Sequence, residues 1–149
     1  MRAVDTNILT RYFRQDDSRQ SPAALQVMAG RSVFCPKTVV LEFEWVMRHV
    51  YRHNPRDVAR CLNTLLNLPN VILEDEQQIV EAVRGYERGM DFADALHLAA
   101  SHGCEDLATF DARRFARRAR RLALKPPIGR TPATPAPRQA APPTAGRRA

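Results

Sequence analysis

The sequence is poor in cysteine and in aromatic side chains, and it has no long apolar run. Its three cysteines, Cys35, Cys61 and Cys104, are odd in number and never closely spaced, which argues against a disulfide framework and against a zinc site. No apolar segment approaches the roughly 20 residues needed to cross a bilayer, and the first residues are not typical of a signal peptide. We therefore expect a cytoplasmic protein.

Acidic residues are missing from the C-terminal part of the chain. Residues 113–121 hold six arginines and no acid, and residues 125–149 hold five basic side chains and no acid. The formal net charge of +7 therefore hides a mildly acidic body, because residues 1–112 carry 12 basic and 16 acidic side chains. A basic margin favours a polyanionic partner, although a solvated arginine-rich tail would have the same composition.

The chain of 149 residues is long enough for one domain with a substantial core. From Pro126 onward it contains seven of its 11 prolines and, beyond Ile128, no apolar side chain larger than alanine other than proline. Such a segment cannot bury enough apolar surface to offset the entropy lost on ordering. We expect a folded domain over residues 1–125 and a disordered Pro/Ala/Arg-rich tail over residues 126–149.

Short apolar segments alternate with helical patterns along the domain. Strands are expected at residues 2–4, 32–35, 70–73, 106–111 (the strand with its exit) and, at the edge, 122–124. Helices are expected at residues 8–13, 21–29, 38–51, 55–68, 75–88 and 93–100, followed by an arginine-rich helix. This alternation predicts an α/β fold with a mostly parallel sheet covered on both faces. Ligands of such sheets bind beyond the carboxyl ends of the strands, where Asp5 and Asp111 are placed.

The segment 93–100 is small and apolar around most of its circumference, as in a helix inserted into a core. Asp94, His97 and Ser101 form one polar stripe along it, and Asp91 is placed to act as its N-cap. A carboxylate on a buried helix is costly unless a cation or a hydrogen-bond donor meets it. His97 could carry a proton, but a histidine at the rim of a pocket or hydrogen-bonded between helices is the simpler interpretation, since a metal-activated water needs no histidine.

The helix expected at residues 38–51 contains two glutamates with different expected environments. Counted at 100° per residue, Glu42 lies at the shoulder of the apolar cluster and can face a half-buried cleft. Glu44 lies on the far side, with Arg48 as its i,i+4 partner. We expect Glu44 to be solvated.

Four carboxylates are thus candidates for one site: Asp5, Glu42, Asp94 and Asp111. Carboxylates about 4 Å apart repel by about 4 kcal/mol at an effective dielectric constant near 20, so a cluster of them requires a counter-charge. Mg²⁺ and Mn²⁺ prefer carboxylate and water oxygens as ligands. Each acid also has a simpler interpretation as an N-cap, a turn residue or part of a solvated face.

Four segments resemble, in order and spacing, the signature segments of the PIN-domain ribonucleases, and most closely those of the VapC toxins of bacterial toxin–antitoxin pairs. They are Asp-Thr-Asn-Ile-Leu at 5–9, Leu-Glu-Phe-Glu-Trp-Val-Met-Arg at 41–48, Asp-Phe-Ala-Asp-Ala-Leu-His at 91–97 and Thr-Phe-Asp at 109–111. The resemblance covers about residues 1–124. It implies a three-layer α/β/α sandwich and Mg²⁺- or Mn²⁺-dependent endonucleolytic cleavage of RNA.

By the same resemblance, the family's acidic quartet corresponds to Asp5, Glu42, Asp94 and Asp111, as metal ligands that activate a water molecule. Its polar assistants correspond to Asn7 or Thr6 and to Thr109, which would hydrogen-bond a neighbouring carboxylate. The partners implied are an RNA substrate, a cognate antitoxin protein and a second copy in a homodimer. Several apolar residues of the first helices could serve these contacts or pack in the core instead: Tyr12, Phe13, Leu25, Trp45, Val50 and Tyr51. The proline-rich tail departs from the compact toxins.

The arginines after Asp111 are expected to border the site. We interpret Arg113, Arg114, Arg117 and Arg118 as contacts for RNA phosphates, the alternative being a solvated helix face. The motifs provide no aromatic platform for reading bases, so RNA shape and single-stranded loops are the expected basis of selection.

Three alternatives stay open: a catalytically inert PIN-like binding module, a PIN ribonuclease in RNA processing, and a phosphatase of the haloacid-dehalogenase kind. The phosphatase needs a second aspartate where this chain has Asn7.

Overall fold

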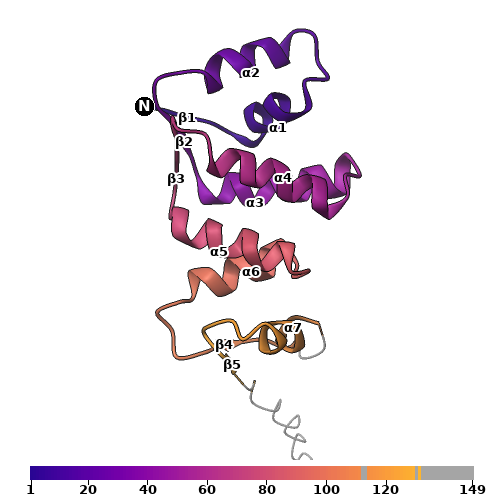
Figure 1. The fold of residues 1–149 in the computed structure, drawn as a ribbon, viewed down its shortest axis with the longest axis vertical. Helices are drawn as coiled ribbons and strands as arrows, with labels where there is room; N and C mark the ends of the chain where they lie inside the picture. The colour runs from indigo at the N-terminus through magenta and orange to yellow at the C-terminus, as the bar shows by residue number, and fades with distance from the viewer. Residues whose placement is uncertain (112–113, 130, 132–149) are drawn as a thin grey trace, which may run out of the picture.

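The computed structural model describes residues 1–111, 114–129 and 131, in which short strands alternate with helices (Figure 1). The strands are β1 Arg2–Ala3, β2 Val33–Cys35, β3 Val71–Leu73, β4 Leu107–Ala108 and β5 Ile128–Gly129. The helices are α1 Thr6–Arg14, α2 Gln20–Met28, α3 Lys37–Trp45, η1 Val46–Val50, α4 Pro55–Leu66, α5 Glu76–Glu87, α6 Phe92–Ala100 and α7 Phe115–Arg121.

All strand pairing in the described residues is parallel, and it forms two separate sheets. Strand β2 lies between β1 and β3, with Val33 opposite both Arg2 and Val71. Strands β4 and β5 pair only with each other, with Leu107 opposite Ile128. The expected α/β class with parallel strands is therefore confirmed. The strands of the C-terminal part do not extend the first sheet.

The helices lie in pairs along the molecule. Helix α1 packs on α2, α4 on α5 and α5 on α6, while α3 contacts both α1 and α6. Figure 1 shows α7, β4 and β5 together at the end of the molecule opposite α1 and α2. Apolar side chains from all these helices form one buried cluster, in which Phe43 and Phe92 are completely inaccessible to solvent.

The helix that starts at Lys37 does not remain α-helical to its end. From Val46 to Val50 it is a π-helix, in which the amide of Tyr51 donates to the carbonyl of Val46 at 3.1 Å. Segments of this kind occur frequently at functional sites. The sequence predicts one continuous helix over residues 38–51. A continuous helix is present, but its last segment, Val46–Val50, is a π-helix instead of an α-helix.

Two predictions about the C-terminal part are wrong. Residues 122–124 are not a strand, because Leu122 is the C-cap of α7 and Ala123 has a φ of 52°. The fifth strand is instead Ile128–Gly129, which lies inside the segment predicted to be disordered from Pro126. Burial of Ile128 explains this, since one large apolar side chain anchors the strand beside β4. The remainder of the predicted tail, from residue 132, lies outside the described residues.

No helix within the described part of the chain is long and apolar enough to span a membrane.

The core makes a direct prediction about stability. Replacing Phe92 by alanine should lower the free energy of unfolding by about 3–5 kcal/mol, because the ring is fully buried and packs edge-on against Tyr86 at 5.6 Å. The matched control is Phe110→Ala, since Phe110 is 84% exposed and surface changes usually stay within about 0.5 kcal/mol. Urea unfolding monitored by circular dichroism measures both, and equal values for the two variants would contradict the packing described.

Candidate functional site

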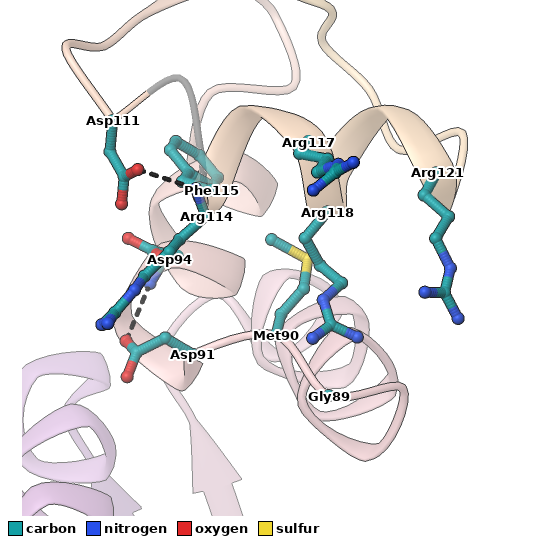
Figure 2. A pocket seen from close by; sticks show the side chains of 10 residues that line it. All are labelled: Gly89, Met90, Asp91, Asp94, Asp111, Arg114, Phe115, Arg117, Arg118 and Arg121. Atoms are coloured by element: carbon teal, nitrogen blue, oxygen red, sulfur yellow. Dashed lines mark hydrogen bonds between the residues drawn. The ribbon is translucent and has the colours of Figure 1, made fainter.

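Asp94 faces a cavity of about 690 Å³ that separates the start of α6 from α7. Figure 2 shows carboxylates and arginines around it, with Asp91 and Asp94 from the α6 side and Asp111 and Arg114 from the α7 side. The rest of its lining comes from Gly89, Met90, Phe115, Arg117, Arg118 and Arg121. Asp91 is the N-cap of α6, as predicted, and its Oδ1 accepts from the amides of Ala93 at 3.0 Å and Asp94 at 3.4 Å.

The surroundings of Asp94 make its negative charge unfavourable. Burial raises the pKa of Asp94, and the neighbouring carboxylates of Asp91 and Asp111 raise it further, while His97 acts weakly in the opposite direction. A carboxylate in this position is stabilised by any cation that enters the cavity. Asp94 therefore has the electrostatic character expected of a ligand for a metal ion.

Asp111 reaches the cavity from the loop that follows β4. The hydroxyl of Thr109 accepts a hydrogen bond from the backbone amide of Asp111 at 3.0 Å, and Asp111 Oδ1 accepts from the amide of Arg114 at 2.9 Å. Thr109 thus positions the backbone of Asp111. The Thr109 hydroxyl makes no hydrogen bond to a carboxylate among the described residues, but it only accepts from the amide and its O–H can still donate, so its predicted bond to a carboxylate stays a prediction.

Four arginines line the same cavity: Arg114, Arg117, Arg118 and Arg121. Within the described residues, none of their guanidinium groups has a carboxylate within 4.0 Å. Arg114 was predicted to border the site and does so. Arg121 was missed, although its spacing of three to four residues from Arg117 and Arg118 on a helix is a signal that could have identified it. Arg113 lies outside the described residues.

Asp5 and Glu42 line a second cavity of about 210 Å³, between α1 and α3. Asp5 caps α1, accepting from the amide of Ile8 at 2.9 Å. The hydroxyl of buried Thr6 donates to Glu42 Oε2 at 2.5 Å and fixes its orientation. Thr6, rather than Asn7, is therefore the residue that supports Glu42, while Asn7 lines the cavity without a side-chain hydrogen bond among the described residues.

The structure thus brings the four predicted carboxylates together as two pairs in two cavities. Within the part of the chain that it describes, no three acidic, histidine or cysteine side chains lie close enough to share one ion. The cause is the strand arrangement, because Asp5 follows β1 and Asp111 follows β4, and these strands belong to different sheets. Mg²⁺ usually takes only one or two protein carboxylates and keeps several waters. The donor chemistry of the Asp94–Asp111 pair fits such an ion.

The prediction that Glu44 is solvated is wrong. Glu44 is 2% exposed, and its Oε1 lies 2.5 Å from Nε of Arg48, the partner that the i,i+4 spacing predicts. Burial raises the pKa of Glu44, while Tyr86 and Arg48 lower it. Glu44 follows Val40 and Phe43 in the buried stripe of α3 at spacings i, i+3 and i+4. That period was readable in the sequence, but a glutamate within it was assigned to the surface.

His97 and part of the predicted partner surface are accessible. His97 is exposed and lines a third cavity, between α3 and α6, together with Trp45 and Arg48. Trp45 is 53% exposed and stacks on His49 with ring centroids 5.1 Å apart. Val50 and Leu25 are also exposed. Three of the residues proposed for partner contacts pack against the core instead: Tyr12, Phe13 and Tyr51.

The family of the chain follows from comparison with known proteins. Residues 2–121 match the model of the PIN domain family, which is most of the chain. The chain belongs to the PIN domain family. This membership confirms the predicted fold class, an α/β fold of the PIN type with parallel strands.

One similar solved structure is VapC20 from Mycobacterium tuberculosis, described as a Sarcin-Ricin loop cleaving toxin. It is 21% identical, the comparison covers 78% of this chain and 94% of that one, and the TM-score is 0.40. No curated protein matches this PIN-domain chain.

The raised pKa of Asp94 predicts how the metal-free protein responds to pH. Above that pKa the charged side chain is less favourable in the folded state than in the unfolded state, so it lowers stability. The penalty disappears as pH falls through the folded-state pKa towards that of the unfolded chain. Asp94→Asn should therefore raise the melting temperature at pH 7 in EDTA, and the difference should shrink at acidic pH.

Differential scanning fluorimetry at several pH values measures this effect, with exposed Glu105→Gln as the control that should change nothing. Added Mg²⁺ should stabilise the wild type and not Asp94→Asn. An Asp94→Asn protein that is less stable at pH 7 and as stable in acid would show that its surroundings favour the charged form.

Proposed function

We propose that this PIN-domain protein is a Mg²⁺- or Mn²⁺-dependent endoribonuclease. The observation that carries the proposal is the cavity in which Asp94 and Asp111 lie beside four arginines without carboxylate partners among the described residues. Phosphodiester cleavage needs positive charge to hold a phosphate and oxygen ligands to hold a metal ion. Membership of the PIN family supports the same activity.

In the proposed mechanism, Asp94 and Asp111 would hold the divalent ion. When bound, the ion supplies activation of a water molecule and offsets charge that develops on the phosphate. Thr109 keeps Asp111 in place through the backbone of the turn. The arginines of α7 would bind phosphates of the RNA, because guanidinium groups match phosphate geometry.

Asp5 and Glu42 complete the proposed acidic quartet as a second pair of oxygen ligands. Thr6 orients Glu42 by its hydrogen bond, in the way that groups behind a metal ligand commonly tune it. One carboxylate oxygen of Asp5 accepts the hydrogen bond that caps α1, which leaves the other oxygen available as a ligand in the cavity. Asn7 lies beside them as a further polar group.

We further propose that the protein is the toxin of a toxin–antitoxin pair, with RNA as substrate, a small antitoxin protein as inhibitor and a homodimer as the assembly. The motif resemblance to VapC toxins supports this biological role. The exposed apolar side chains of Leu25, Trp45 and Val50 provide surface for these protein contacts. An inert PIN module, the other possibility, is an outcome of the experiment that follows.

Removing either carboxylate of the main cavity should abolish cleavage. Asp94→Asn and Asp111→Asn should each lower the rate of RNA cleavage by about 100-fold or more, because each removes an ionised ligand of the metal. The assay follows a labelled structured RNA with single-stranded loops, in Mg²⁺, in Mn²⁺ and in EDTA. Exposed Glu76→Gln is the matched control and should retain wild-type activity.

The same variants test the biological role in cells. Expression of the wild type should arrest growth, and Asp94→Asn should relieve the arrest at equal protein level. Cleavage that is unchanged in EDTA or in Asp94→Asn would refute the metal-dependent mechanism. A folded wild type without any nuclease activity would identify the inert module instead.

The arginines of α7 should determine how RNA binding responds to salt. Each phosphate contact removed should make the slope of log affinity against log salt shallower by about 0.7 for single-stranded RNA. We expect this in Arg117→Ala and in Arg118→Ala, both measured in the Asp94→Asn background so that the RNA stays intact. Exposed Arg84 on α5 provides the control Arg84→Ala. Slopes equal to that of the control would show that the arginines of α7 do not contact RNA phosphates and only face solvent.

A further inference from the structure

Arg48 joins the helix that carries Glu42 to the helix that carries Asp94. Its Nε lies 2.5 Å from Oε1 of Glu44, and its NH2 group lies 2.9 Å from Oδ2 of Asp91. Glu44 belongs to α3, Arg48 to η1, and Asp91 is the N-cap of α6. One guanidinium group therefore contacts two carboxylates that are 47 residues apart in the sequence.

The two oxygens of Asp91 have different partners. Oδ1 accepts from the amides of Ala93 and Asp94 and so closes the first turn of α6, while Oδ2 accepts from Arg48. The side chain of Asp91 therefore links Arg48 on one side to the backbone amide of Asp94 on the other. Arg48 is thus connected, through Asp91, to the turn that carries the residue proposed to hold the metal.

The surroundings of Arg48 leave it little freedom. Glu44 is almost fully buried, and the buried hydroxyl of Tyr86 lies next to it. Glu44 Oε1 and Arg48 Nε are close enough for an ion pair but are not aligned as a hydrogen bond. Tyr86 also packs edge-on against Phe92, the first residue of α6. A guanidinium group can contact two carboxylates at once because its donors diverge in a plane, whereas an ammonium group is a point charge. The π-helical winding of η1 is the local backbone that presents Arg48 to both partners.

We propose that Arg48 is a positioning residue that, held by buried Glu44, fixes the N-terminal turn of α6 through Asp91 and thereby sets the geometry of Asp94 for the divalent ion. The inference rests on the proposed function. A surface ion pair would contribute little, but here the anchor is buried and the target is the cap of the helix that carries the metal ligand. Groups behind a metal ligand typically change metal affinity about 10- to 100-fold when removed.

The test uses the double variant Glu44→Gln/Arg48→Met, which removes both charges of the buried pair and leaves no uncompensated buried ion. Mn²⁺ binding to the full chain, followed by electron paramagnetic resonance of the free ion, should show a dissociation constant raised about 10- to 100-fold. RNA affinity in EDTA should be unchanged. The matched control is Lys37→Met, which breaks another ion pair of α3, that with Asp75 at 2.7 Å, and should bind Mn²⁺ like the wild type.

A second variant covers the possibility that the double variant does not fold. Arg48→Lys keeps the positive charge beside Glu44, but its single ammonium group cannot hold both carboxylates, so Mn²⁺ affinity should fall by less than in the double variant and by more than in Lys37→Met. Wild-type Mn²⁺ affinity in a folded double variant, or in Arg48→Lys, would overturn the inference. If the wild type itself binds no Mn²⁺ and cleaves no RNA, the proposed function fails instead.

Discussion

Repulsion between carboxylates at the start of α6 is the constraint on which the rest of the site depends. Asp91, Asp94 and Asp111 lie near one another, and the pKa of Asp94 is raised by burial and by both neighbours. The chain relieves this crowding for two of the three. Asp91 receives backbone amides and Arg48, and Asp111 receives the amide of Arg114. Among the described residues, no donor forms a hydrogen bond with the side chain of Asp94. Its negative charge would therefore be stabilised by a cation, either free or bound with a substrate.

The distribution of arginines follows from the same electrostatics. Arg48 is committed to Glu44 and Asp91, whereas the guanidinium groups of α7 face the cavity without carboxylate partners in the described part of the chain. Neutralising Asp94 with one of these arginines would have satisfied the site internally and closed it to a metal ion. Because they stay apart, carboxylates lie beside guanidinium groups in one cavity, an arrangement that would suit the proposed divalent ion together with a phosphate.

Much of the fold was readable in the sequence because short apolar strands alternate with amphipathic helices, and the N-cap role of Asp91 followed from its place before Phe92. The errors have physical causes. Ile128 stood in a proline-rich setting, so its capacity to anchor β5 was overlooked. The pairing of β4 with β5 depends on contacts between distant residues, which local patterns do not encode. For that reason the four acids could be identified one by one, while their division into two pairs could not.

Glu42 and Glu44 show most clearly where the reasoning from local pattern ends. Both are glutamates on α3, two residues apart. A helical projection predicts that Glu42 faces the cleft and that Glu44 faces solvent. Glu44 instead occupies a core position, because its charge is met by Arg48 from within the same helix. A buried ion pair of this kind contributes little net stability compared with apolar side chains of similar size. The pair also lies within one continuous helix, so it does not by itself orient that helix against α6; the contact that relates the two helices is the one from Arg48 to Asp91.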